Sequence, residues 1–266
     1  MTTNPRGHTV AVVQARMGST RFPGKVLAPL RGEPMVLRQL ERVRRARRID
    51  DIVVAVPESS EDDDLARVCK DAGYRVVRGD SEDVLSRFLL AADASNATVI
   101  VRITADCPLI SPHIIDLVID TFHASDADYV SNTLEPTYPD GLDVEVVTTD
   151  ALRNVARSSH DPAEREHVTL GVYRYPERFA VCNVVDESGH DHSNLRWTVD
   201  TPEDLEFVRQ IYDIVLPTIP EFDYGDILDV IEQRVELCRD ASAGRRNAAL
   251  DGLDTGAMKH GEGGDA

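Results

Sequence analysis

The sequence lacks several features that mark particular classes of protein. Its four cysteines lie far apart and form no Cys-x-x-Cys pair, which excludes a zinc ribbon or a thioredoxin-type dithiol and fits free thiols. No apolar run reaches the roughly 18 residues that a membrane span needs. Residues 1–8 are polar and lack the apolar stretch of a secretory signal. We therefore expect a cytoplasmic protein that does not bind a membrane.

Positive charge is also scarce. The sequence has 29 lysines and arginines against 47 aspartates and glutamates, which gives a formal net charge of −18. Because contact with a nucleic-acid duplex needs a basic footprint, we expect no nucleic-acid partner. Residues 16–48 are the exception, with ten basic and only two acidic residues. A basic segment in an acidic protein indicates a local site for an anion such as phosphate, although Arg38–Arg48 also fits the solvated face of a helix.

In the first half of the chain, short apolar strands alternate with amphipathic helices. The strands are predicted at residues 9–14, 52–56, 74–77 and 98–103, and the helices at 34–48, 60–70, 82–92 and 111–122. This alternation predicts an α/β fold whose mainly parallel sheet carries helices on both faces.

After about residue 128 the pattern changes. Further strands are predicted at 128–131, 142–147, 179–184 and 195–199, and helices at 201–214 and 224–238. We expect a single domain over residues 8–239 with a β-rich insertion at about 132–185. Residues 240–266 are rich in Gly, Ala and Asp without a period, which predicts a disordered C-terminal tail.

The segment after the first predicted strand has the composition of a phosphate-binding loop, at the strand end where α/β sheets bind ligands. The residues that favour this are Arg16, Gly18, Ser19, Thr20, Arg21, Gly24 and Lys25. The glycines let the backbone approach a ligand, the amides of residues 18–20 can cradle anionic oxygens, and the basic side chains suit a triphosphate. The spacing fits neither a Walker A loop nor a dinucleotide fingerprint. The alternative is a plain Gly/Pro turn with surface basic residues.

Two aspartates end predicted strands. Asp106 follows residues 98–103, and Asp200 follows residues 195–199. Because the carboxyl ends of parallel strands share one edge of a sheet, the two carboxylates can converge over the loop and bind Mg²⁺ together with substrate phosphates. The alternatives are a turn-forming Asp106 and an Asp200 that favours a helix start. Cys107 has no evident partner base, so we interpret it as a packing residue.

The sequence around these residues resembles the cytidylyltransferase family that activates sugars as CMP derivatives, which includes the CMP-Kdo and CMP-sialic acid synthetases. It is most similar to the spore-coat polysaccharide branch. The resemblance covers about residues 9–215. Besides the loop it rests on four stretches, Arg78–Asp80, Val101–Leu109, Tyr138–Glu145 and Trp197–Leu205. It implies a Rossmann-like fold of the nucleotide-diphospho-sugar transferase type and a homodimer.

The resemblance also implies a reaction in which an acceptor oxygen attacks the α-phosphorus of CTP and pyrophosphate leaves. The expected catalytic residues are Lys25, Arg16 and Arg21, and the expected ligands of Mg²⁺ or Mn²⁺ are Asp106 and Asp200. The expected contacts of CTP are Ala15, Gly18, Ser19, Thr20, Lys25, Arg78 and Thr104. The expected contacts of a sugar-type acceptor are Tyr138, Asp140, Asp143, Glu145 and His167.

Two other functions remain open. A glycosyltransferase that uses a nucleotide sugar shares this architecture but would need Asp-x-Asp at a strand end, whereas Cys107 follows Asp106 and Asp62-Asp63-Asp64 lies at a helix start, where a solvated first turn is favoured. A non-catalytic nucleotide-binding protein would be favoured if the metal carboxylates were missing. Turnover of CTP with release of pyrophosphate separates the three functions.

Overall fold

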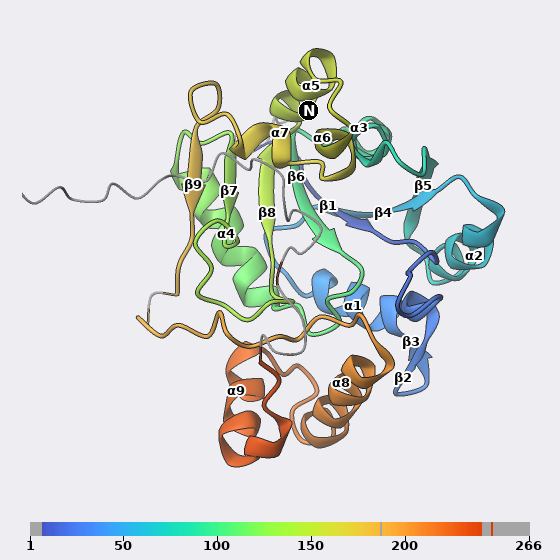
Figure 1. The fold of residues 1–266 in the computed structure, drawn as a ribbon, viewed down its shortest axis with the longest axis vertical. Coiled ribbons are helices and arrows are strands. Elements are labelled where there is room, and N and C mark those ends of the chain that lie inside the picture. Colours follow the sequence, from blue (N-terminus) through green and yellow to red (C-terminus); the bar gives the residue numbers. More distant parts are fainter. Residues whose placement is uncertain (1–6, 187, 241–245, 247–266) are drawn as a thin grey trace, which may run out of the picture.

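The computed structural model describes residues 7–186, 188–240 and 246, and within them seven strands form one sheet (Figure 1). Their order is β5-β4-β1-β6-β8-β7-β9. The parallel part consists of β1 (Thr9–Gln14), β4 (Asp51–Pro57), β5 (Arg75–Gly79) and β6 (Val99–Thr104). β8 (Glu145–Thr148) runs antiparallel to β6 and β7 (Tyr129–Ser131), and β9 (Val181–Asn183) is parallel to β7.

Helices cover both faces of this sheet, so its central strands are apolar on both sides. In β1, Ala11 and Val13 belong to one core cluster, whereas Val10 and Val12 belong to the other. The first face carries α1 (Met35–Arg44), α2 (Asp63–Asp71), α4 (Pro112–Ala124), α8 (Pro202–Val215) and α9 (Tyr224–Gln233). The second face carries α3 (Val84–Ser95), α5 (Thr149–Ser158) and α7 (Leu170–Tyr173), with α6 (Pro162–Glu166) beside α3. The predicted mainly parallel sheet with helices on both faces is therefore confirmed.

Side-chain caps fix the starts of α4 and α8. The Ser111 hydroxyl accepts a hydrogen bond from the Ile114 amide at 3.1 Å and opens α4. Thr201 and Asp204 form a reciprocal capping box at the start of α8. Each such cap contributes about 1 kcal/mol, and both confirm starts that the sequence predicts.

The structure differs from the predicted elements in several places. Residues 195–199 form no strand and make only isolated bridges, from Arg196 to Asp140 and from Leu195 to Asp240. A short hairpin of β2 (Pro29–Leu30) and β3 (Glu33–Pro34) precedes α1, turning at Arg31 and Gly32, both with positive φ. The segment 132–185 contains α5, α6 and α7, and its strands β8 and β9 join the main sheet, so it is less β-rich than expected.

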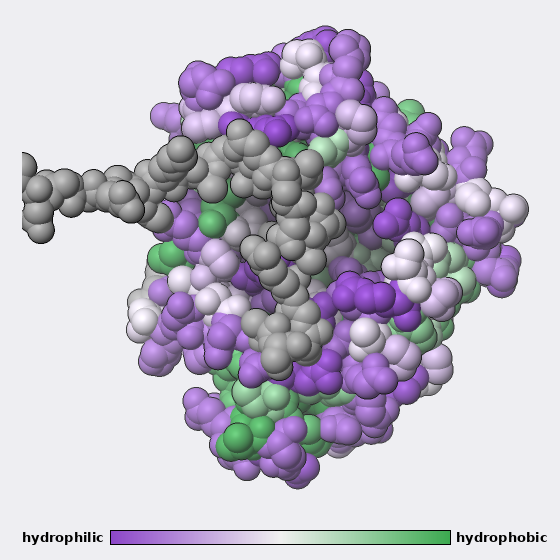
Figure 2. Space-filling model, in the orientation of Figure 1, coloured by the Kyte–Doolittle hydropathy of each residue, from purple (hydrophilic) through white to green (hydrophobic). Residues whose placement is uncertain are grey.

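The C-terminal part after α9 continues with a 3₁₀ turn at Val235–Leu237, so the predicted last helix ends early. The tail predicted over residues 240–266 lies outside the described residues except for Asp240 and Arg246. In the described part of the chain, no helix has the length and apolar character needed to cross a membrane. Figure 2 shows a mainly hydrophilic surface on the viewed face, with apolar residues gathered over α9.

Candidate active site

A cavity of about 510 Å³ opens at the carboxyl ends of β1 and β6. After β1 the chain builds β4 and β5 on one side of it, and then returns to form β6 on the other side. The strand order therefore reverses between β1 and β6, which is the place where open α/β sheets bind their ligands.

The loop after β1 is closed on itself by hydrogen bonds. The Met17 carbonyl accepts from the Ser19 and Gly24 amides, both at 2.9 Å. Gly24 has φ +73°, a conformation that favours glycine, and it leads directly into the 3₁₀ turn Lys25–Leu27. The Ser19 amide is thus used inside the loop, which corrects the expectation that it is free to bind an anionic oxygen.

Asp62 anchors this loop from the neighbouring crossover. Its Oδ1 accepts a hydrogen bond from the Met17 amide at 2.7 Å, and the side chain is buried. Asp63 and Asp64 are exposed, as expected for a solvated first turn. Asp62 differs from that expectation because its carboxylate faces the loop instead of the solvent.

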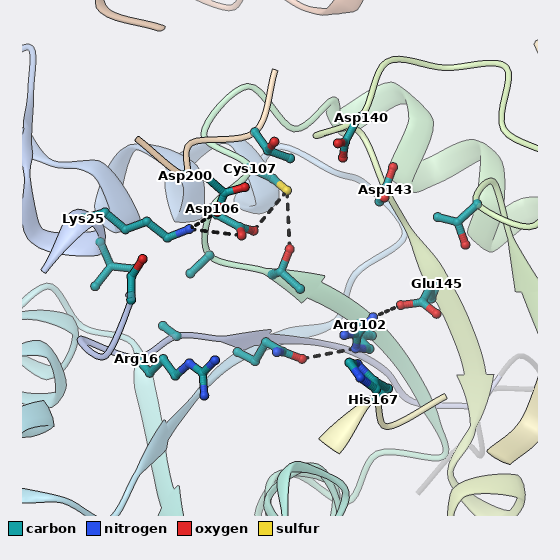
Figure 3. Close-up of a pocket in the computed structure, with 18 of the residues that line it drawn as sticks. Arg16, Lys25, Arg102, Asp106, Cys107, Asp140, Asp143, Glu145, His167 and Asp200 are labelled. Atoms are coloured by element: carbon teal, nitrogen blue, oxygen red, sulfur yellow. Dashed lines mark hydrogen bonds and ion pairs between the residues drawn. The ribbon is translucent and has the colours of Figure 1, made fainter. Parts of the chain in front are cut away.

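Lys25 lies between the two predicted metal ligands (Figure 3). Its Nζ donates to Asp200 Oδ1 at 2.9 Å, to Asp106 Oδ2 at 3.3 Å and to the Val199 carbonyl at 2.7 Å. Burial disfavours the ammonium, but the two carboxylates outweigh burial and raise the pKa of Lys25. Burial likewise disfavours the Asp106 carboxylate, but Lys25 and hydrogen bonds lower its pKa. The two aspartates thus converge on one cationic group although they are distant in sequence.

The same two carboxylates suit a divalent cation. Asp106 Oδ2 and Asp200 Oδ1 already face one positive charge, and Mg²⁺ sites commonly combine one or two carboxylates with substrate phosphates. No group of three or more His, Cys, Asp or Glu side chains among residues 7–186, 188–240 and 246 has the geometry to hold a metal. The donor set therefore fits a cation that arrives with phosphate oxygens as its remaining ligands.

Arg16 and Arg21 complete the positive side of the cavity. Both are exposed, and Arg21 lies 2.9 Å from Asp200 Oδ2. An exposed guanidinium can change partners at little cost, since exposed ion pairs contribute less than about 1 kcal/mol. These side chains are therefore available to bind an anion that enters between the loop and the carboxylates.

At the other end of the cavity, β6 and β8 place a buried ion pair between Arg102 and Glu145 (Figure 3). Glu145 Oε1 also accepts from Tyr129 Oη at 2.7 Å and from Thr169 Oγ1 at 2.6 Å. Glu145 thus joins β8 to β6 and to the α6–α7 region, and it also lines the cavity. Beside it, burial lowers the pKa of His167, which favours the neutral imidazole.

Asp140 and Asp143 face this end of the cavity from the turn before β8. Burial raises the pKa of both carboxyls, that of Asp143 to about 7, although Arg246 opposes the shift. The Arg246 guanidinium donates to Asp143 Oδ1 at 2.9 Å and to the Tyr138 carbonyl at 3.0 Å. A residue of the C-terminal segment therefore contacts the predicted acceptor side.

Most of the predicted site residues line this one cavity. They are Ala15, Arg16, Gly18, Ser19, Thr20, Arg21, Lys25, Thr104, Asp106, Asp140, Asp143, Glu145, His167 and Asp200. Two further predicted contacts, Arg78 and Tyr138, are not among the residues that line it. Arg78 stands on the outer strand β5, donates to the Pro57 carbonyl at 3.0 Å and pairs with Asp63. The Tyr138 ring is buried against Tyr224, with ring centroids 5.6 Å apart.

Several lining residues were not predicted to act in the site. They include Gln14, Arg102, Cys107, Thr133, Thr169, Tyr173, Arg196 and Thr198. Cys107 packs as expected, and burial raises its pKa well above that of an ordinary thiol, so it is no thiolate nucleophile. The sequence does hold a signal for Arg102 and Arg196. Each is an arginine within an apolar, strand-like run, where a buried charged side chain requires a partner of opposite charge.

A Rossmann-like sheet with a cationic loop and paired carboxylates at its switch point is the architecture of a nucleotide-dependent enzyme. The chain belongs to the cytidylyltransferase family, whose model matches residues 10–237. The spore coat polysaccharide biosynthesis protein SpsF of Bacillus subtilis is 34% identical over 208 residues, which are 76% of this chain and 85% of that protein.

A second relative and a solved structure agree with this membership. The 3-deoxy-manno-octulosonate cytidylyltransferase of Anaeromyxobacter dehalogenans is 34% identical over 247 residues, covering 77% of this chain and 97% of that enzyme. The structure of a cytidylyltransferase from Leptospira borgpetersenii superposes with a TM-score of 0.82 at 33% identity, covering 88% of this chain and 97% of that one. The expected enzyme class, a cytidylyltransferase, is thereby confirmed.

Proposed function

We propose that the protein transfers CMP from CTP to a hydroxyl oxygen of a sugar-type acceptor and releases pyrophosphate, in a reaction that needs Mg²⁺ or Mn²⁺. The observation that carries this proposal is the position of Lys25, at the end of the glycine-containing loop, between Asp106 and Asp200 in one cavity. A cationic loop opposite two carboxylates favours a triphosphate bound together with a divalent cation.

In the proposed reaction the chain acts mainly by positioning and by neutralising charge. Arg16 and Arg21 bind the triphosphate, and the Lys25 ammonium stabilises the charge that develops on the leaving pyrophosphate. Asp106 and Asp200 would hold the divalent cation, which supplies charge neutralisation at the phosphate oxygens. The acceptor oxygen bonds to the α-phosphorus, and the bond from that phosphorus to the bridging oxygen of pyrophosphate breaks.

The proton of the acceptor hydroxyl goes to the Asp143 carboxylate in this proposal. Asp143 lines the acceptor end of the cavity, and burial raises its pKa to about 7. A general base works best when its pKa lies near the operating pH. Asp143 combines that pKa with a place opposite the phosphate loop.

The sugar-type acceptor is supported by the named relatives, one of which serves polysaccharide biosynthesis while the other acts on a sugar acid. The acceptor end of the cavity offers polar side chains from Asp140, Glu145 and His167, which suit the hydroxyl groups of a sugar. We further propose a cytoplasmic homodimer, as the family resemblance implies, without a nucleic-acid partner, in keeping with the net charge of −18.

The test is release of pyrophosphate from CTP, GTP, UTP and ATP against a panel of sugars and sugar acids. We expect turnover with CTP and at least one acceptor, and little with GTP. Transfer of sugar from a nucleotide sugar would instead support a glycosyltransferase. Binding of CTP without turnover on any acceptor would support a non-catalytic nucleotide-binding protein.

A further inference from the structure

Arg196 is a buried cation that links the two ends of the cavity. Its side chain is 4% exposed and contacts three carboxylates, one before β8 and two at the start of α8. Its Nη2 donates to Asp200 Oδ2, its Nε lies 3.5 Å from Asp140 Oδ2, and its Nη1 lies 3.4 Å from Asp204 Oδ2. A buried guanidinium is stable only when it is paired. Asp200 accepts a hydrogen bond from it, whereas Asp140 is joined to Nε by charge attraction without a hydrogen bond, so the guanidinium links the metal side, the acceptor side and the start of α8.

The backbone keeps Asp140 and Arg196 side by side. The Asp140 amide donates to the Leu195 carbonyl at 2.9 Å, and the Trp197 amide donates to the Asp140 carbonyl at 2.6 Å. A Cβ at Gly141 would lie 2.8 Å from the Trp197 carbonyl carbon, and Gly141 has φ +110°. Only glycine permits this close approach, so the distance between the two segments is fixed.

The three cations around Asp200 differ in their freedom to move. Arg21 has a side chain 57% exposed and Lys25 one 10% exposed, and both face the cavity where we place the triphosphate. Arg196 is more deeply buried than either, and Asp140 and Asp204 also hold it. When the first two turn toward phosphates, Arg196 still holds Asp200 Oδ2 and keeps Oδ1 directed toward Asp106.

We propose that Arg196 is a positioning residue that aligns Asp200 with Asp106 for the divalent cation. Through Asp140, it also sets the distance between the acceptor side of the cavity and the cation site. The proposal rests on the proposed cytidylyl transfer. Arg196 touches neither reacting group in this account, and it acts through the carboxylates that it orients. Lysine cannot replace it, because a single ammonium lacks the planar fork of donors that reaches several carboxylates.

The structure supplies a matched control at the same carboxylate. Arg239 also pairs with Asp204 and, in the part of the chain that the structure describes, forms no ion pair with Asp140 or Asp200. Asp204 itself caps α8 by accepting from the Asp200 and Thr201 amides. A variant of Arg239 therefore disturbs the same helix start and leaves the carboxylates of the cavity in place.

The experiment measures Mn²⁺ binding with saturating CTP and no acceptor, by the enhancement of water proton relaxation. The variants are Arg196→Lys and the double variant Arg196→Gln with Asp204→Asn, which removes a buried cation and a buried anion together and keeps a side chain able to cap. The control is Arg239→Gln, and Asp204→Asn alone measures the share of the double variant's effect that comes from Asp204. Thermal unfolding of each variant reports whether it is folded.

We expect both Arg196 variants to weaken Mn²⁺ binding at least about tenfold, the scale on which groups that orient metal ligands act. The Arg239→Gln control should stay within about twofold of the wild type, and CTP binding without metal should change little in all four variants. Wild-type Mn²⁺ affinity in a folded Arg196 variant, or an equal loss in Arg239→Gln, would overturn the proposal. A wild-type protein that forms no complex with Mn²⁺ and CTP would contradict the proposed function itself.

Discussion

Replacing Lys25 by methionine tests the electrostatic arrangement at the centre of the site. The change keeps the length of the side chain and removes an ammonium that donates three hydrogen bonds. Asp106 and Asp200 then face each other without the cation between them. Breaking a buried ion pair costs about 3–5 kcal/mol. Because Asp200 keeps its contacts with Arg21 and Arg196, we expect the low end of that range, about 3 kcal/mol of unfolding free energy.

The assay is urea unfolding followed by the fluorescence of Trp197, the single tryptophan of the chain, which is fully buried. Millimolar Mg²⁺ should restore part of the stability lost in Lys25→Met, since two carboxylates without their ammonium can accept a divalent cation. The same substitution at the exposed Lys70 is the control and should change the unfolding midpoint little.

Two results would refute this reasoning. If Lys25→Met unfolded at the wild-type urea concentration, the ion pairs would contribute nothing to the fold. If Mg²⁺ stabilised the wild type, Lys25→Met and Lys70→Met equally, the carboxylates would not form the cation site. The kcat/KM of Lys25→Met should also fall at least tenfold, which corresponds to about 1.5 kcal/mol or more of lost hydrogen bonding to charged groups.

Three further outcomes are expected. In the pyrophosphate assay with Mg²⁺, Asp106→Asn should lose most of the activity, and a chelator should abolish the activity of the wild type. The control Asp64→Asn, at an exposed position, should be as active as the wild type. The value of kcat/KM should fall as the pH drops below about 7, because Asp143 must be ionised to accept a proton. Asp143→Asn should remove this decrease at acidic pH. Arg246→Ala should move the decrease to higher pH, because it removes a positive charge that favours the Asp143 carboxylate. Arg16→Ala should lower kcat/KM for CTP at least about tenfold, and unchanged kinetics would remove Arg16 from the phosphate site.

The parts of the fold that local sequence determines were predictable. β1 has the predicted bounds because a short apolar run rich in β-branched residues, bounded by polar residues, favours a buried strand. The starts of α4 and α8 follow from Ser111 and Thr201, whose side chains cap the amides directly after them. The convergence of Asp106 and Asp200 on Lys25 was also predicted, but strand ends explain only Asp106, which follows β6. Asp200 follows residues 195–199, which make only isolated bridges in place of the predicted strand.

Other features depend on contacts between distant segments. Leu195, Trp197 and Val199 alternate with polar residues and are all buried, but alternation reports burial and not the presence of a pairing strand. Arg78 ends a strand as Asp106 does, yet β5 lies at the outer edge of the sheet, away from the reversal of strand order between β1 and β6. A rule about strand ends therefore places a residue at the site only if the strand order is known.

The contacts of Arg196 and Asp62 were also beyond local reasoning. Arg196 meets Asp140 only because Gly141 permits close packing of two loops, and nothing near Arg196 in sequence indicates that partner. The sequence predicts that Asp62 is one of three solvent-exposed aspartates, but its carboxylate is buried and accepts a hydrogen bond from the Met17 amide of the loop after β1. In both residues a partner brought by the fold decides the function of an ordinary charged side chain.

The most direct test of cytidylyl transfer is ³¹P NMR of CTP with the purified protein, Mg²⁺ and a sugar or sugar-acid acceptor that supports pyrophosphate release. The account predicts that the three resonances of CTP are replaced by those of pyrophosphate and one phosphodiester joining CMP to the acceptor. GTP under the same conditions should remain unchanged. Release of orthophosphate, formation of CMP without an acceptor adduct, or equal conversion of GTP would contradict the account.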